Sequence, residues 1–232
     1  MRSFSIKKSL ILVSILAIPG FLFFYILPHF AKNRYKSLPI FGEKVVAKTF
    51  HTVKGKKIPD TIYHVVPDFS FVNQANETLN WSALKGNIVV LNLFYKSSSL
   101  KDVNLNVQKI AESYERNPLI RFLSLSVDPS DYPYNLKSLT DSLGAKAGKW
   151  DFLSGDTLKV YPFIRKGLLL DIIHHEEKGK TKFIYGNQIV LLDNQHRIRG
   201  YYEATNADAL AKLDDEIKVL VAEDLRNIKD GR

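Results

Sequence analysis

The stretch Ile88–Tyr95, IVVLNLFY, decides the fold. All of its residues except Asn92 are apolar, and a near-continuous apolar run of this length is typical of a central strand that is covered on both faces. Further along the chain, residues 105–114 carry apolar residues at helical spacing, and residues 120–127, IRFLSLSV, read as a second buried strand. This succession of strand, helix and strand predicts an α/β fold.

The elements around these strands complete the predicted topology. Upstream, Val65–Val72 and Thr78–Leu79 flank the turn-prone residues NQANE and predict a hairpin, which a short helical turn at Trp81–Leu84 follows. Downstream, we expect helices at about 134–143 and 157–165 with a short segment at 150–153 between them, a hairpin of 182–192 with 197–202, and an amphipathic helix at 207–228. This order is that of a thioredoxin-like central mixed sheet flanked by helices, with an added N-terminal β-hairpin.

The N-terminal region differs in composition from the rest of the chain. Ser9–Leu27 contains no charged residue and is just long enough to cross a bilayer core of about 30 Å as a helix. A cleaved signal peptide is the rival interpretation, and we favour an uncleaved transmembrane anchor because no small-residue cleavage site follows. We therefore expect a cytoplasmic N-terminus at 1–8, an anchor at 9–27, a basic stem or linker at 28–59 and a folded domain at 60–232.

Charge and cysteine content exclude several functions. The net charge of +9 comes from residues 1–57, which hold eleven Lys or Arg and the single acid Glu43, so the remainder is nearly neutral. We interpret the basic stretch as a membrane-flanking stem and expect no nucleic-acid partner. The chain has no cysteine, which excludes disulfides, thiolate nucleophiles and thiolate-bound metals.

Several strings in the folded part resemble the SCO/SenC family, in a specific combination and order. They are DTIYHVVPDFSFVNQ (60–74), ALKGNIVVLNLFY (83–95), IRFLSLSVDPSDYP (120–133), KWDFLSGD (149–156) and IVLLDNQHRIRGYYEAT (189–205). The resemblance implies a thioredoxin-like domain behind one N-terminal helix, on the periplasmic side of the inner membrane. It also implies a role in copper delivery, thiol chemistry and cytochrome c oxidase assembly.

The resemblance further implies a copper site made of a C-x-x-x-C-P motif after the central strand and one later histidine. In this sequence Ser98 and Asp102 stand at the two cysteine positions, and Tyr185 stands at the histidine position. Cu(I) prefers soft thiolate or imidazole donors, so none of these replacements suits it. We therefore expect no cofactor, no thiol exchange and no enzymatic activity.

Two further groups of residues could take part in chemistry. His174 and His175 lie in an acidic segment that we expect to be a loop, and together with Asp102 they could form a relocated metal site. Asp128 and Asp131 follow a buried strand, where we interpret them as residues of a structural turn.

These observations leave three hypotheses. We prefer a non-catalytic interaction or assembly module with a protein partner in respiratory-complex assembly. The alternatives are a metal-binding protein with relocated ligands and an enzyme of another class on the same scaffold. No residue of the sequence supports the enzyme hypothesis.

Overall fold

The computed structural model describes residues 6–26, 37–53, 55–96, 101–177 and 180–229, and the chain divides into two compact units, residues 1–36 and 37–232. In the first unit, α1 (Ile6–Phe21) continues into a π-helical turn, Leu22–Ile26. Leu27, the last residue of the predicted anchor, lies outside the described residues. Within the described part of the chain, no helix combines the length and the apolar character that crossing a membrane requires.

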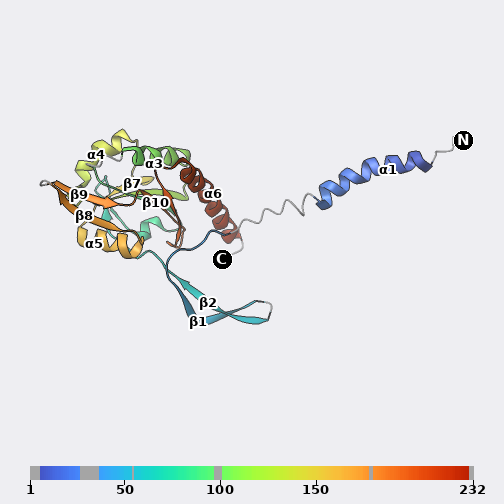
Figure 1. The fold of residues 1–232 in the computed structure, drawn as a ribbon, viewed down its shortest axis with the longest axis horizontal. Coiled ribbons are helices and arrows are strands. Elements are labelled where there is room, and N and C mark those ends of the chain that lie inside the picture. Colours follow the sequence, from blue (N-terminus) through green and yellow to red (C-terminus); the bar gives the residue numbers. More distant parts are fainter. Residues whose placement is uncertain (1–5, 27–36, 54, 97–100, 178–179, 230–232) are drawn as a thin grey trace. The chain divides into compact units, whose positions relative to one another are not determined.

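The second unit is built on a mixed five-stranded sheet in the order β11-β10-β5-β6-β7 (Figure 1). Strands β5, β6 and β7 are parallel, whereas β10 pairs antiparallel with both β5 and β11. The bounds are β5 (Ile88–Phe94), β6 (Ile120–Ser126), β7 (Trp150–Leu153), β10 (Gln188–Leu192) and β11 (Ile198–Glu203). The apolar run that decides the fold is therefore the central strand, as the sequence predicts.

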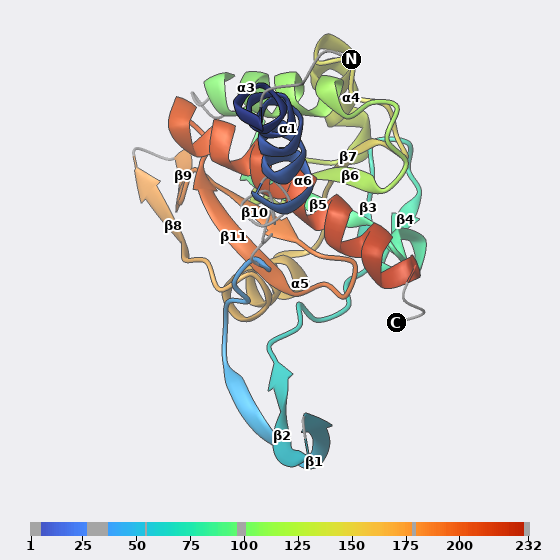
Figure 2. The same ribbon diagram turned by 90° about the vertical axis from the view of Figure 1, so that its right-hand side faces the viewer.

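Every residue of β5 is buried because both faces of the sheet are covered. Alternate residues of a strand point to opposite faces, so Val89, Leu91 and Leu93 join one hydrophobic cluster while Val90 and Phe94 join the other. Figure 2 shows α3 and α5 on opposite sides of the sheet. Both clusters consist only of residues from the second unit, which therefore has its own core and is expected to fold independently.

The helices of the second unit confirm the predicted order. They are α3 (Lys101–Ser113), α4 (Pro133–Ser142), α5 (Thr157–Pro162), which continues into a π-helical turn at Phe163–Gly167, and α6 (Ala207–Lys229). Asp156 caps α5, since its side chain accepts a hydrogen bond from the backbone N–H of Leu158 at 2.8 Å.

The region that we expect to be a basic stem or linker contains most of a hairpin. β1 (Lys44–Val53) pairs antiparallel with β2 (Lys56–Tyr63), and Figure 2 shows the pair projecting from the sheet domain. The compact unit correspondingly begins at Ser37 rather than at residue 60. This ribbon carries no strand signal in its sequence: neither of its faces is covered, so its residues do not alternate between apolar and polar.

A second hairpin also differs from the expectation. β8 (Ile172–Glu177) pairs antiparallel with β9 (Lys180–Tyr185), so His174 and His175 lie in a strand and not in a loop. The sequence pattern predicts one strand over 182–192, but Gly186 and Asn187 separate β9 from β10, and the two strands belong to different sheets.

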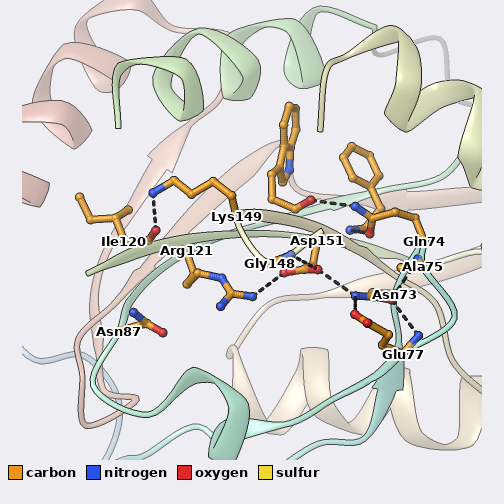
Figure 3. A network of polar contacts seen from close by, with 12 residues as sticks. Asn73, Gln74, Ala75, Glu77, Asn87, Ile120, Arg121, Gly148, Lys149 and Asp151 are labelled. Atoms are coloured by element: carbon orange, nitrogen blue, oxygen red, sulfur yellow. Dashed lines mark hydrogen bonds and ion pairs between the residues drawn. The ribbon is translucent and has the colours of Figure 1, made fainter. Parts of the chain in front are cut away.

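A buried polar network attaches the predicted N-terminal hairpin of the domain, β3 (Phe71–Val72) and β4 (Thr78–Leu79), to the edge strand β7 (Figure 3). Asn73 donates to Asp151 Oδ1 at 3.0 Å, and Arg121 donates to Asp151 Oδ2 at 2.8 Å. Gln74 makes two hydrogen bonds to the backbone of β7: it donates to the carbonyl of Trp150 and accepts from the N–H of Phe152. After β4, a 3-10 turn at Trp81–Leu84 leads into the central strand.

Candidate functional site

The carboxyl ends of β5 and β6 meet at a buried carboxylate. Asp131 is 5% exposed and accepts hydrogen bonds from the backbone N–H of Lys96 at 2.9 Å and from Ser126 Oγ at 2.6 Å. Burial raises the pKa of Asp131, and the two hydrogen bonds act in the opposite direction. Asp131 therefore fixes the backbone that leaves the central strand, at the edge of the sheet where sites in α/β folds form.

Asp128 has the structural role that we expected for it. Its carboxylate accepts from the backbone N–H of Ser130 at 2.8 Å and from Ser130 Oγ at 2.7 Å, as in an Asx turn. Asp131 does more than close this turn, because it joins two strands that are distant in sequence.

A cavity of about 290 Å³ lies beside the end of β5. Apolar residues of β5, α3 and α4 form most of its wall, and polar groups come from Tyr95, Lys96, Asn104, Ser142 and Tyr185. The ring of Tyr95 contacts Phe183 and Tyr185 of β9, with centroid separations of 5.2 Å and 6.0 Å. The β8–β9 hairpin is thereby held against the end of the central strand.

Of the three positions that the family resemblance aligns with copper ligands, the structure places Tyr185 in the wall of this cavity. Tyr185 and Val103, the residue after Asp102, line the same cavity. Asp102 itself is an exposed residue in the first turn of α3. Ser98 lies outside the described residues.

The donors at these positions do not fit a Cu(I) site. A hydroxyl, a carboxylate and a phenol are hard or protonated donors, whereas Cu(I) requires thiolate, thioether or imidazole. The sequence contains no cysteine, and its only methionine is Met1. The residues at the aligned positions therefore cannot reproduce the copper chemistry that the resemblance implies.

Sequence reasoning did not identify Tyr95 and Asn104 as residues of the cavity wall. The side-chain Oδ1 of Asn104 is buried and has no hydrogen-bond partner among the residues that the structure describes. No sequence signal marks an asparagine within a helix as the wall of a cavity, because the cavity depends on how α3 packs against distant elements. Tyr95 ends the apolar run and reads as core.

The relocated metal site has little geometric support. His174 pairs with Phe183 and His175 with Lys182 in the β8–β9 ribbon, and consecutive residues of a strand alternate between its two faces. Within the described ranges, no group of three or more His, Asp or Glu residues is arranged to hold a metal ion.

Comparison with known proteins gives one family and one fold. The model of the SCO1/SenC family matches residues 59–220. No curated protein matches the chain.

Solved structures with the same fold share few residues with this chain. A SCO1/SenC family lipoprotein from Bacillus anthracis is 21% identical, with a TM-score of 0.62, and the match covers 68% of this chain and 95% of that one. BsSco, described as a member of the Sco family of cytochrome c oxidase assembly proteins with a disulfide switch, is 19% identical, with a TM-score of 0.59 and coverage of 68% and 93%. Copper-bound ScoI from Bradyrhizobium japonicum is 18% identical, with a TM-score of 0.55 and coverage of 65% and 98%. At these identities the likeness establishes the fold alone.

Proposed function

The chain belongs to the SCO1/SenC family, and from this premise we propose that it is a non-redox interaction module in the assembly of a cytochrome c oxidase. The family is linked to oxidase assembly and to copper. The relative BsSco is described as a member of a family of cytochrome c oxidase assembly proteins and as having a disulfide switch. A switch of that kind needs two thiols, which this chain lacks.

The observation that carries the proposal is a complete domain combined with an unsuitable donor set. The sheet, its two cores and the helices are all in place. Selection for copper or thiol chemistry would have kept the donors, whereas selection for a binding surface keeps the scaffold that presents it. We therefore propose that the protein acts by contact with a partner, binds no copper cofactor and has no enzymatic activity.

We place the domain outside the cytoplasm, tethered to the inner membrane by Ser9–Leu27. The absence of charge from this segment supports the tether, as do the basic residues Lys32, Arg34 and Lys36 that follow it. Protease added to intact spheroplasts should remove the domain. Protection of the domain until the cells are lysed would contradict the orientation.

The proposed role can be tested by deleting the gene in its host and measuring cytochrome c oxidase activity in isolated membranes. We expect the activity to fall and the wild-type gene to restore it. Copper added to the growth medium should not replace the gene, because a non-redox module does not act by supplying the metal. Unchanged oxidase activity after deletion would refute the role in assembly, and full rescue by added copper would show that the protein delivers the metal.

A further inference from the structure

The β1–β2 hairpin is attached to the domain only at its base in the contacts that the structure describes. There the backbone N–H of Phe41 donates to the carbonyl of Ile198 at 2.9 Å, and His64 Nε2 lies 2.8 Å from the carbonyl oxygen of Gly167. Gly42, with φ of +95°, lets the chain pass directly beside His64. The hairpin is thus fixed to the domain at its root, residues 41–42 and 64. The two strands β1 and β2 beyond the root are uncovered, and we call them the blade.

Apolar side chains are exposed on both faces of this blade. Val45 pairs with Ile62 on one face, and Val46 pairs with Thr61 on the other. Val46 is 70% exposed, Phe50 61% and Ile62 59%. A two-stranded hairpin in water is marginally stable by itself, so exposed apolar residues on both of its faces indicate that something covers them.

The same blade is strongly basic. Residues 43–63 contain five lysines and only two acids, Glu43 and Asp60. Lys44, Lys48, Lys56 and Lys57 are exposed. Asp60 lies 2.6 Å from the ring of His51, so part of the acidic charge is already paired within the ribbon. The folded remainder of the chain is close to neutral, which makes the hairpin a local basic element.

We propose that the β1–β2 hairpin docks in the headgroup layer of an anionic membrane. Apolar residues on both faces, interspersed with lysines, suit immersion in an interface, where lipid surrounds the ribbon and anionic headgroups attract the lysines. A partner protein would cover one face, and a second copy would bring like charges together. The ribbon lies in the headgroup region and not in the hydrocarbon, because the outer edges of both strands have backbone groups that need hydrogen-bond partners.

Vesicle sedimentation tests this proposal with residues 37–232, which lack the predicted anchor. We expect binding to vesicles of phosphatidylcholine and phosphatidylglycerol mixed about two to one, little binding to phosphatidylcholine alone, and release by salt. The double variant Lys56→Gln, Lys57→Gln should bind about twenty-five-fold more weakly, since each lysine near an anionic surface contributes about a factor of five. The variant Val46→Ser, Phe50→Ser should also lose binding.

Matched control variants separate the hairpin from general charge and hydrophobicity. Lys137→Gln with Lys159→Gln removes the same charge from the helices of the domain, and Leu158→Ser removes a side chain that is 82% exposed there. Both controls should bind as the unchanged protein does. Equal losses in the hairpin variants and the controls would overturn the proposal. Failure of the unchanged protein to bind anionic vesicles at low salt would also overturn it and leave an acidic protein surface as the partner.

A fluorescent reporter tests the geometry independently of affinity. Phe50→Trp places an indole on the blade, whereas the native Trp81 and Trp150 are only 7% and 3% exposed and should respond little to vesicles. Anionic vesicles should shift its emission to the blue, and lipids brominated near the headgroup should quench it. Absence of both effects in bound protein would show that another surface contacts the lipid. Because the anchor is missing from this protein, the result is independent of whether Ser9–Leu27 spans the membrane.

Discussion

Replacement of Asp151 by alanine should destabilise the domain severely. The Asp151 side chain has no solvent exposure and accepts three hydrogen bonds: from Asn73 Nδ2 at 3.0 Å, from the backbone N–H of Gly148 at 3.0 Å and from Arg121 Nη2 at 2.8 Å. Removing one partner of a buried ion pair costs about 3–5 kcal/mol, and each buried donor left unpaired costs about 1–3 kcal/mol. These costs overlap because the same groups relax together, so we expect a loss of about 4 kcal/mol.

A loss of this size is a large part of the total stability of a domain, which is about 5–15 kcal/mol. Urea unfolding of residues 37–232, followed by tryptophan fluorescence, measures it as a lower midpoint with an unchanged slope. Glu115→Ala is the control, because it also removes a carboxylate from an ion pair, but Glu115 and Lys146 are 57% and 75% exposed. The control should leave the midpoint nearly unchanged. If Asp151→Ala shifts the midpoint no more than Glu115→Ala, the network in Figure 3 does not stabilise the domain as we reason.

Two further substitutions test other parts of the fold. Burial, with the nearby Asp193 and Glu223 charges, raises the pKa of Asp224 to about 6. The folded state then binds more protons than the unfolded state between about pH 4 and pH 6, so this group lowers stability as pH rises through that range. Asp224→Asn should therefore stabilise the domain by about 2 kcal/mol at pH 7 and not at pH 4 in urea titrations, and an equal gain at both would refute the assignment. Gly42→Ala should loosen the hairpin root and raise amide exchange in β1 and β2, because its Cβ would lie 2.5 Å from that of His64; unchanged exchange would contradict this.

The sequence predicted the strands that are covered on both faces and the helix that is covered on one continuous face. The strands β5 and β6 are covered on both faces, so their apolar runs identify them directly, and α6 carries a sustained amphipathic pattern. The turn at Asp128 was also predictable, because an aspartate before a proline accepts local hydrogen bonds.

The elements that escaped prediction lack a pattern of that kind. The β1–β2 ribbon is exposed on both faces and rich in lysine, and therefore resembles a linker in composition. The break at Gly186 that separates β9 from β10 is a tertiary feature, because the strands on its two sides pair with different partners. The cavity beside Tyr95 likewise joins residues that are up to about ninety positions apart, from Leu93 to Tyr185.

The aligned ligand positions were identified by resemblance, and of the two that the structure describes, Tyr185 lines the cavity and Asp102 is exposed in the first turn of α3. Tyr185 reaches the cavity at the end of the central strand because β9 packs its aromatic residues against Tyr95. The lack of a thiolate at the aligned positions followed from the residue types alone, because a chain without cysteine cannot supply one in any arrangement.

The most direct test of the central claim is a Cu(I) competition titration of residues 37–232 against a strong chromophoric chelator. The unchanged protein should leave all of the copper with the chelator, because its donors at the aligned positions are hard or protonated. The triple variant Ser98→Cys, Asp102→Cys, Tyr185→His should retain one Cu(I) if those positions surround one point, and it serves as the positive control. One equivalent of Cu(I) held by the unchanged protein would contradict the proposal that this chain has no copper site.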